Sequence, residues 1–462
     1  MKLKEIEQLG IQGRDAVDAA LRVVRSAGLK KAELRDRLTS VAHDPSAFFD
    51  DPVFGELARA VAARSVQPAG YAERAQAAPW KQWGDDLEPQ AVQQMVNACR
   101  LPVAVRGALM PDAHVGYGLP IGGVLATENS VIPYAVGVDI ACRMRLTVLD
   151  LPAAALERDR KRLVRALEDE TRFGVGAEFR HPRDHPVMSL DWGVTPVTKT
   201  LKRKAQAQLG TSGSGNHFVE YGILTLDHPD LGLQPGTYVA LLSHSGSRGS
   251  GAQVAAHYSR LARDLHPDLP KELSHLAWLD LDREEGQEYW AAMELMGHYA
   301  AANHEVIHRE VVRNLGARAL ATIENHHNFA WKEVHDGRLV IVHRKGATPA
   351  DRGVLGVIPG SMASPAFVVR GKGSAESLNS AAHGAGRVMS RTQALKTFRW
   401  EDVKKHLKEK GVTLISAGLD EVPMVYKDIH QVMAAQQDLV DRVARFMPKL
   451  VKMAPAGERP ED

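Results

Sequence analysis

Glycine-rich segments divide the sequence from about Trp80 onward into short pieces, and this spacing limits the folds that the chain can adopt. Because glycine weakens the interiors of helices and strands, such segments are typical of turns and loops. They are HVGYGLPIGG (114–123), GTSGSGNHF (210–218), HSGSRGSG (244–251), HRKGA (343–347), PGSM (359–362) and HGAGR (383–387). The chain should therefore build its core from short strands and scattered helices joined by many loops.

Strand-like runs lie between these loops, among them TYVALLS (237–243) and LVIVH (339–343). Apolar residues at helical spacing predict helices at 157–170, 285–315 and 430–447. These elements do not alternate in a βαβ rhythm, so we expect an α+β fold rather than a doubly wound sheet.

Residues 1–70 differ from the rest because Ala, Leu and Val recur at helical spacing among charges and glycine is sparse. We interpret this region as a small helical appendage that ends near Gln67-Pro68-Ala69-Gly70 and has no cluster of reactive residues. A stability cap is the simplest role, with docking or oligomerisation as the alternative. Residues 80–453 form the main domain, and the tail 454–462, APAGERPED, has the composition of a disordered segment.

Overall charge and cysteine content exclude several classes of protein. Lys and Arg total 58 and Asp and Glu total 56, so nothing global attracts a polyanion. Two basic segments, 158–165 and 200–208, are interpreted as solvated helix faces, with contact to a polyanion as the alternative. Two cysteines are too few for a disulfide framework, and the sequence has neither a signal peptide nor an apolar run of about 18 residues. We expect a cytoplasmic protein without a membrane segment.

Three loop motifs offer residues that ligate metals. Asp139 and Cys142 stand three apart after a glycine and can offer one hard and one soft ligand, although a lone cysteine is equally often a small buried apolar residue. His217 follows a Gly-Ser-Gly turn, and His244 stands where a strand ends. In the loop after His244, Ser247 and an arginine can cradle phosphate.

Histidines in two further loops extend this set. His326 and His327 are adjacent, so on extended backbone at most one of them faces the site. Cysteine, neutral imidazole and carboxylate together suit Mn, Zn, Fe or Co rather than Mg or Ca. His383 stands between small residues and beside an anion-binding turn, where its imidazole can act as a nucleophile towards phosphorus. Asp112 is a candidate for fixing the tautomer of such a histidine.

The segment from His304 to His308 matches the H-E-x-x-H pattern of zinc peptidases and lies in a predicted helix. This pattern is short, and no third ligand has a convincing setting on a following helix. We interpret the two histidines as an exposed helix face.

Taken together, the motifs resemble the RtcB family of GTP-dependent RNA ligases, in family order from about Trp80 to Lys452. The matching stretches are MPDAHVGYGLPIGG, VIPYAVGVDIAC, GSGNHFVE, HSGSRG, HHN, HRKGA, VIPGSM, ESLNSAAHGAGRVMSR and EVPMVYKDI. The resemblance implies the RtcB-type α+β fold around a deep metal-lined cleft. It also implies an enzyme that joins RNA 2′,3′-cyclic phosphate or 3′-phosphate ends to 5′-hydroxyl ends, in RNA repair or tRNA splicing.

The resemblance also implies a role for individual residues. The ligands of a two-manganese centre, with Cys142 able to bridge both ions, are Asp139, Cys142, His217, His244 and His327. His383 matches the histidine that is guanylylated by GTP, and Asp112 matches its orienting partner. The positions that match nucleotide-binding residues are Asn216, Phe218, Glu220, Asn328, Pro359, Gly360, Ser361, Met362, Gly384, Ala385, Gly386, Tyr426 and Lys452, with Lys449 as the competitor of Lys452. Candidates for holding RNA or nucleotide phosphates are Ser247, Arg248 and Arg387.

Three residues depart from the family pattern. Arg143 follows Cys142 where glycine is usual, and we expect it to add bulk and charge beside the metals. Ala366 stands where a serine contacts the nucleotide, and Ser212 replaces a leucine. Three alternatives stay open: a guanylyl transferase that caps RNA 3′-ends but seals them poorly, an RNA-binding protein with a structural metal, and the peptidase. The sequence defines neither the RNA substrate nor an activating protein partner.

Overall fold

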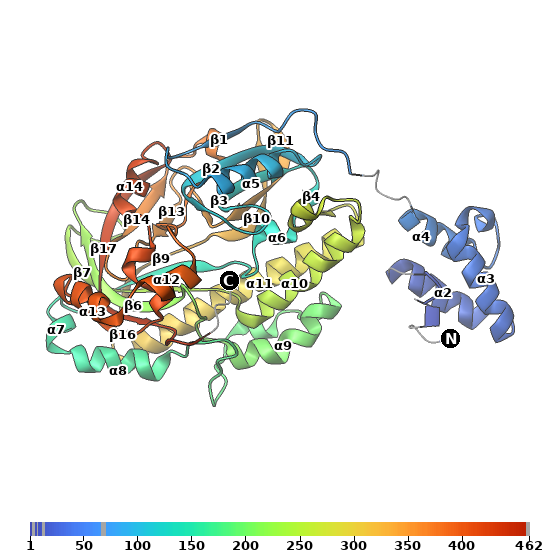
Figure 1. Cartoon of the computed structure of the whole chain (residues 1–462). Coiled ribbons are helices and arrows are strands. Elements are labelled where there is room, and N and C mark those ends of the chain that lie inside the picture. Colours follow the sequence, from blue (N-terminus) through green and yellow to red (C-terminus); the bar gives the residue numbers. More distant parts are fainter. Residues whose placement is uncertain (2–4, 7, 12–13, 66–70, 459–462) are drawn as a thin grey trace. The chain divides into compact units, whose positions relative to one another are not determined.

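The computed structural model describes residues 1, 5–6, 8–11, 14–65 and 71–458, and the chain divides into two compact units, Met1–Ala72 and Glu73–Asp462 (Figure 1). The first unit contains α2 (Arg14–Ser26), α3 (Lys31–His43), the short 3-10 helix η1 (Pro45–Phe48) and α4 (Gly55–Ser65). Its own apolar core includes Ile6, Leu38, Val41 and Leu57, all fully buried. The predicted end of the appendage, Gln67 to Gly70, lies outside the described residues.

The second unit contains a five-stranded sheet in the order β1-β2-β3-β11-β10. Its strands are β1 (Trp80–Gln82), β2 (Ala104–His114), β3 (Ile121–Thr127), β11 (Arg338–Lys345) and β10 (Asn328–His335). β1 runs parallel to β2, and the other pairs are antiparallel. Two-stranded sheets are formed by β12 (Ala347–Pro349) with β15 (Ser380–Ala382) and by β4 (Ser130–Val131) with β8 (Leu279–Asp280).

The larger sheet has the order β13-β14-β17-β6-β7-β5-β9, with β16 (Thr413–Ser416) added parallel to β17. Its other strands are β13 (Leu355–Ile358), β14 (Ala366–Gly371), β17 (Val440–Met453), β6 (Phe218–Leu226), β7 (Gly236–Ser245), β5 (Arg143–Leu149) and β9 (Ala319–His326). The two ends of this path meet, because the Asn325 side chain on β9 hydrogen-bonds both backbone groups of Val357 on β13. The sheet is therefore nearly closed, like a barrel.

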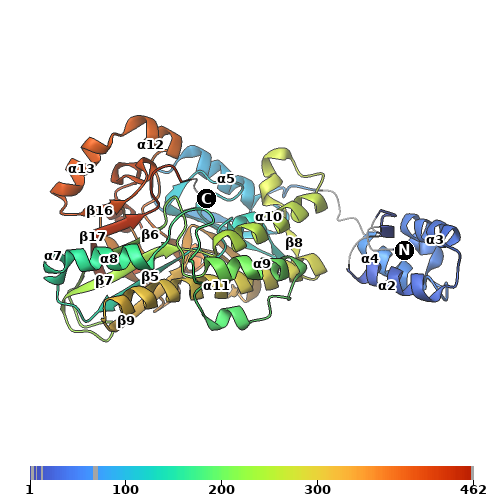
Figure 2. The same ribbon diagram turned by 90° about the horizontal axis from the view of Figure 1, so that it is seen from below.

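Helices cover these sheets. They are α5 (Pro89–Cys99), α6 (Pro133–Val136), α7 (Ala155–Arg158), α8 (Arg160–Glu170), α9 (Pro196–Gln208), α10 (Arg248–Leu265), α11 (Glu284–Asn314), α12 (Arg391–Thr397), α13 (Trp400–Glu409) and α14 (Ile429–Ala434). The short 3-10 helices are η2 (Pro186–Ser189), η3 (Lys271–Leu276), η4 (Ala375–Ser377), η5 (Leu419–Glu421) and η6 (Pro423–Val425). Helices α8 to α11 lie together along one side of the large sheet (Figures 1 and 2). Leu163 of α8 and Ile307 of α11 share a buried core there with Leu241 of β7.

The structure confirms the predicted α+β class: the strands are largely antiparallel and pair across long stretches of sequence. The helix predicted at 430–447 is wrong, because only Ile429–Ala434 is helical and Val440 begins strand β17. Pairing of β17 with β6 and β14 outweighs the helix-like spacing of its apolar residues. In the described part of the chain, none of the helices combines the length and the apolar character needed to cross a membrane.

Candidate active site

Four neighbouring strands of the large sheet bring one cysteine and three histidines together. His217 directly precedes β6, His244 is the second-last residue of β7, Cys142 directly precedes β5, and His327 directly follows β9. Because β6, β7, β5 and β9 are consecutive and antiparallel, these chain positions meet at one edge of the sheet. Cys142 and His217, which are 75 residues apart in the sequence, thereby come into contact.

The four side chains and Asp139 form two overlapping groups that share Cys142. The Cys142 Sγ atom lies 3.1 Å from His244 Nε2 and 3.4 Å from His217 Nε2. The Nε2 atoms of His244 and His327 are 3.1 Å apart, and Asp139 Oδ2 lies 3.2 Å from His217 Nε2. Within each group of three, the ligand atoms lie within 4.8 Å of one another. This set of sulfur, imidazole and carboxylate donors fits a borderline transition metal.

Burial keeps the imidazoles of this cluster in the form that binds metals. Desolvation lowers the pKa of His244 to about 3 and holds the pKa of His327 well below its ordinary value, so both rings are neutral near pH 7. His244 Nδ1 lies 3.1 Å from the Asn216 carbonyl oxygen, and donating its proton there leaves a lone pair on Nε2. Burial raises the pKa of Asp139, but its hydrogen bond with His217 and nearby charges outweigh burial and keep that pKa below its ordinary value.

The loop after His244 supports Asp139. Ser247 donates to Asp139 Oδ1 from its backbone N–H at 3.0 Å and its hydroxyl at 3.3 Å. A Cβ atom on Gly246 would lie 2.0 Å from Asp139 Oδ2, so only glycine allows this approach. Ser247 is thus fully buried behind the cluster. Its predicted contact with RNA phosphates gains no support from this position.

Arg248 is the second prediction that the structure does not support. Its side chain is buried, with 2% exposed, rather than presented to solvent. The guanidinium donates to Thr211 Oγ1 at 3.2 Å and to the Gly174 carbonyl at 3.3 Å. These bonds hold the glycine-rich loop before His217 instead of an external phosphate.

His383 lies beside the cluster and contacts Asp112. It follows β15, and its ring centroid is 4.9 Å from that of His327. Asp112 on β2 is fully buried, and its Oδ2 accepts from His383 Nδ1 at 2.7 Å. Because this bond occupies Nδ1, the other ring nitrogen, Nε2, keeps its lone pair for a substrate. At Gly386, with φ +74°, a Cβ would lie 2.0 Å from the Asp112 carbonyl oxygen, so this turn requires glycine.

A cavity of about 680 Å³ opens onto the cluster and His383. It is lined by the five metal-ligand candidates, by His383 and by every predicted nucleotide-binding residue except Lys452, namely Asn216, Phe218, Glu220, Asn328, Pro359, Gly360, Ser361, Met362, Gly384, Ala385, Gly386 and Tyr426. Glu220 is buried, and desolvation raises its pKa well above the ordinary value. The cavity thus contains both the Asp112-bound His383 and a buried carboxyl group, that of Glu220.

Lys452 is not brought to this cavity. Side chains alternate along β17, and Val451 and Met453 line the cavity while Lys452 lies on the opposite face. Its Nζ donates to the carbonyls of Leu167 and Thr171 at 3.1 and 3.3 Å. The competing Lys449 does not line this cavity either.

Arg387 lines the cavity, but acidic neighbours hold its guanidinium. It donates to Glu421 Oε2 at 3.3 Å and to the Asp420 carbonyl at 2.8 Å, and it lies over the ring of Tyr426. Arg391 forms an ion pair with the same Glu421. A phosphate bound here would therefore compete with Glu421 for two arginines.

Several cavity residues were missed in the sequence. Lys345 is buried, its Nζ donates to the Tyr117 carbonyl at 2.6 Å, and burial lowers its pKa to about 7. The HRKGA segment contains this lysine, and its place beside a glycine turn was the available signal. Tyr117 is 66% exposed at the cavity, where its ring meets those of Tyr134 and His275. Nothing in their spacing predicted this aromatic group.

The H-E-x-x-H histidines are not exposed, which corrects that interpretation. His304 and His308 are buried between α11 and the sheet, 0% and 3% exposed. Ser243 Oγ lies 2.8 Å from His304 Nδ1 and 2.9 Å from His308 Nε2. His304 Nε2 also lies 2.9 Å from the Ser245 carbonyl. Their ring nitrogens are committed to structural hydrogen bonds, and neither belongs to a metal-ligand group among the described residues.

Of the bulk and charge expected from Arg143 beside the metals, only the bulk needs correction, because the charge of Arg143 still interacts electrostatically with Cys142. Arg143 and Cys142 are adjacent at the start of β5, so their side chains point to opposite faces. The Arg143 guanidinium is buried and pairs with Glu324 on β9 at 3.5 Å. Ala366 does line the cavity, as expected, whereas Ser212 is buried away from it.

Comparisons with known proteins identify the family of this chain. The family model described as tRNA-splicing ligase RtcB matches residues 94–193 and 188–453. The RNA-splicing ligase RtcB of Escherichia coli K12 is 35% identical over 396 residues, which cover 79% of this chain and 94% of the relative. The RNA-splicing ligase RtcB of Mycobacterium tuberculosis is 33% identical over 433 residues, which cover 77% of this chain and 98% of the relative. The tRNA-splicing ligase RtcB of Methanococcus maripaludis is 31% identical over 449 residues, which cover 81% of this chain and 92% of the relative. The chain therefore belongs to the RtcB family.

Proposed function

We propose that this chain is an RNA ligase that uses GTP and Mn²⁺ to join 3′-phosphate or 2′,3′-cyclic phosphate ends to 5′-hydroxyl ends. One observation carries the proposal: His383 lines a cavity beside a Cys/His cluster, and Asp112 occupies its Nδ1 at 2.7 Å. A histidine held in this way has the orientation and tautomer of a nucleophile. The names of the relatives support the substrate class.

His383 Nε2 attacks the α-phosphorus of GTP in the proposed first step. A phosphorus–nitrogen bond forms, the bond from that phosphorus to the bridging oxygen breaks, and pyrophosphate leaves. The RNA 3′-phosphate then takes the guanylyl group and frees His383. Finally, the 5′-hydroxyl oxygen attacks the RNA phosphorus, loses its proton, and displaces GMP. Asp112 stabilises the positive charge that His383 carries while it is bonded to phosphorus.

Residues of the cavity fit the nucleotide. Glu220 lies with Phe218 and Met453 in the part of the cavity formed by β6 and β17, where a carboxyl group can accept from the N–H groups of guanine. The turns at 359–362 and 383–387 offer backbone N–H groups and small side chains to phosphates. Ala366 lines the same cavity without a hydroxyl, so this enzyme should bind the nucleotide with one hydrogen bond fewer than a serine would allow.

The donor set would hold two manganese ions, because its two groups of possible ligands overlap at Cys142. Asp139, Cys142 and His217 would hold one ion, and Cys142, His244 and His327 would hold the other. A bound divalent ion supplies Lewis-acid stabilisation to phosphoryl transfer and activates water to open a cyclic phosphate. The residues themselves orient the donors and keep the imidazoles neutral.

Labelled GTP provides the test. The protein is incubated with GTP labelled at the α-phosphate and Mn²⁺, and then with RNA that has 3′-phosphate and 5′-hydroxyl ends. We expect label first on the protein, mapped to His383, and then a sealed strand. Capped 3′-ends that never seal would assign the chain to end capping, and a protein that never takes up label would overturn the guanylylated histidine.

Matched variants separate the roles. The His383→Ala variant should retain its metal but take up no label, whereas the His304→Ala variant, where it folds, should still take up label. Metal content measured on the same samples excludes loss of the cluster as the cause. Label on the His383→Ala variant would contradict the assignment.

A further inference from the structure

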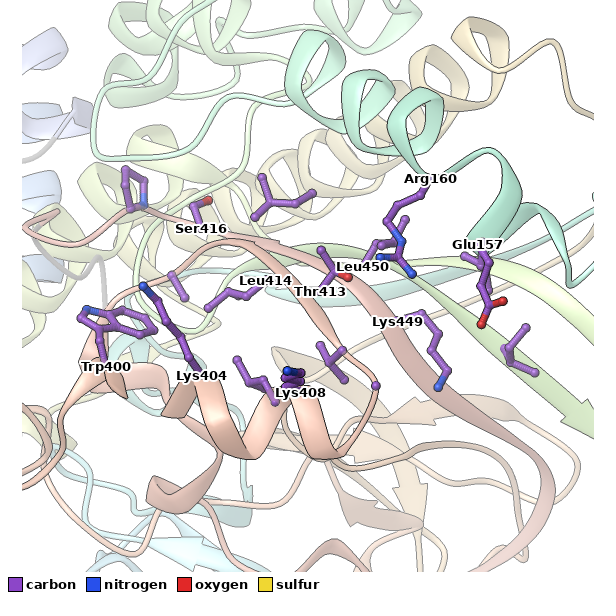
Figure 3. Close-up of a pocket in the computed structure, with 18 of the residues that line it drawn as sticks. Glu157, Arg160, Trp400, Lys404, Lys408, Thr413, Leu414, Ser416, Lys449 and Leu450 are labelled. Atoms are coloured by element: carbon purple, nitrogen blue, oxygen red, sulfur yellow. The ribbon is translucent and has the colours of Figure 1, made fainter. Parts of the chain in front are cut away.

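A second cavity, of about 1150 Å³, lies between α13, β16 and the end of β17 (Figure 3). Residues 153–160 around α7 and the start of α8 form its other wall. It shares no lining residue with the cavity that contains His383. It is larger than most small-molecule pockets, which occupy roughly 300–1,000 Å³.

Cationic side chains dominate this second cavity. Lys404 and Lys408 stand four apart on one face of α13, Lys449 extends from β17, and Arg160 begins α8. Glu157 is the one acidic residue in the lining, so four positive charges less one negative give a local charge of +3. Within the described part of the chain, none of the four cations forms an ion pair. Because the whole chain has a formal charge of only +2, this cavity is a local concentration of unpaired positive charge.

An aromatic ring and an apolar floor accompany the charges. Trp400 lies near Lys404 toward one end of the cavity, and Arg160 and Lys449 lie toward the other (Figure 3). Leu414 and Leu450 form part of the floor between them. Ammonium groups along a groove bind a phosphate backbone, and aromatic and apolar faces accept unstacked bases. An acidic peptide would use the charges, but its backbone, unlike a nucleic acid, does not supply a flat ring at every residue to place on Trp400.

The position of the cavity suits a strand that leaves the catalytic cavity. Strand β17 contributes Lys449 and Leu450 to this cavity and Val451 and Met453 to the catalytic one. Likewise Arg391 and Gln393 of α12 line the catalytic cavity, and α13 follows α12 directly. Because Leu450 and Val451 point to opposite faces of β17, a polymer that spans both cavities would pass from one face of this strand to the other.

We propose that this second cavity is an accessory binding site for single-stranded RNA, which holds the strand by its phosphates at a distance from the reacting end. The proposal rests on the RNA ligase function proposed above. It adds a site that makes binding depend on strand length: a short oligonucleotide reaches the catalytic cavity alone, whereas a longer one occupies both.

The test removes three of the cations together. The triple variant Lys404→Gln, Lys408→Gln, Lys449→Gln is compared with Lys396→Gln, Lys405→Gln, Lys410→Gln, which removes the same charge from exposed lysines of the same region that line neither cavity. Binding of a fluorescent RNA of about 20 nucleotides, longer than the roughly 4–16 nucleotides of a typical single-strand site, is measured at several salt concentrations.

The cavity variant should bind the long RNA at least about tenfold more weakly, and the salt dependence of log K should fall by about 2, since each lost phosphate contact contributes about 0.7. The control variant should change binding less than twofold. Binding of a trinucleotide and labelling of His383 by GTP should be unchanged in both. Equal losses in the two triple variants would show a general charge effect and overturn the site.

Crosslinking gives a second, independent readout. RNA with 4-thiouridine at internal positions should crosslink to peptides from residues 400–417, and polyglutamate of equal charge should not compete. Crosslinks confined to the catalytic cavity, or full competition by polyglutamate, would overturn the proposal. Because these measurements record binding alone, a chain that binds long RNA here but seals no ends would refute the ligase function and leave this site standing.

Discussion

Asp112 Oδ2 accepts three N–H groups from one turn: His383 Nδ1 at 2.7 Å and the backbone N–H groups of His383 and Gly384 at 3.2 and 3.3 Å. A single buried carboxylate oxygen thus fixes both the ring and the backbone of the proposed nucleophile. The ring keeps 15% of its side-chain surface exposed to the cavity, while Asp112 has none. Asp112 therefore holds His383 from the buried side, and the ring stays accessible from the cavity.

The Asp112→Asn variant should lose most of its guanylylation. An amide removes the negative charge, and if its NH₂ group faces Nδ1, the ring carries its proton on Nε2 and lacks the lone pair that attacks phosphorus. We expect the rate of covalent GMP incorporation to fall by about 10²-fold or more, with metal content unchanged. Labelling at the wild-type rate would show that Asp112 does not orient the nucleophile.

Cys142 should matter for both metal ions because both ligand groups contain it. The Cys142→Ala variant should therefore lose both ions, whereas His217→Ala, which affects one group, should retain one. Metal stoichiometry after dialysis, measured by mass spectrometry, checks this expectation.

Cys99 provides the matched control for this experiment. It is equally buried, on α5, and burial raises the pKa of its thiol to about 12, so it stays protonated. The Cys99→Ala variant should keep the full metal content. Equal retention of metal by the Cys142 and Cys99 variants would rule out the shared thiolate.

The cluster was predictable because its members stand where strands meet loops. Cys142, His217 and His327 flank strands directly, and such positions aim side chains at a sheet edge. What the sequence could not provide is the full strand order: β6 and β7 form a hairpin, but β5 pairs with β7 and β9 through residues far apart in the chain.

The two predictions that the structure does not support, for Lys452 and Arg248, share a physical reason, since each position depends on tertiary packing. Lys452 is placed away from the cavity by the alternation of β17, whose register shifts between Pro448 and Leu450. Arg248 follows an accessible-looking glycine-rich loop, yet helix α10 buries it. Neither the register shift of β17 nor the burial of Arg248 can be predicted from the local sequence.

His304→Ala should destabilise the fold and leave the metal site filled. The buried ring bonds Ser243 Oγ at 2.8 Å and the Ser245 carbonyl at 2.9 Å, so its removal leaves a cavity and unsatisfied groups. We expect a loss of about 2–4 kcal/mol in the free energy of unfolding by urea. Glu305→Ala, at an exposed position of the same motif, should stay within about 0.5 kcal/mol of wild type. Loss of metal in the His304 variant would contradict this prediction and support the peptidase interpretation.

His343 should make stability depend on pH. Its Nε2 accepts the Ile132 N–H at 2.9 Å, and burial lowers its pKa to about 4, below the ordinary 6.5. Above pH 6.5 the folded and unfolded chains both hold this ring neutral. As the pH falls from 6.5 to 4, this histidine binds a proton in the unfolded chain but not in the folded chain. The free energy of unfolding therefore falls by about 1.4 kcal/mol per pH unit.

The His343→Gln variant isolates this effect, since glutamine can still accept a hydrogen bond but does not titrate. The stability advantage of wild type over this variant should shrink by roughly 3 kcal/mol between pH 7 and pH 4 in urea unfolding. His298→Gln, on the exposed face of α11, is the control and should leave the pH dependence unchanged. If the difference between wild type and the His343 variant is the same at every pH, the buried ring is not excluding the proton, and acid unfolding must begin elsewhere.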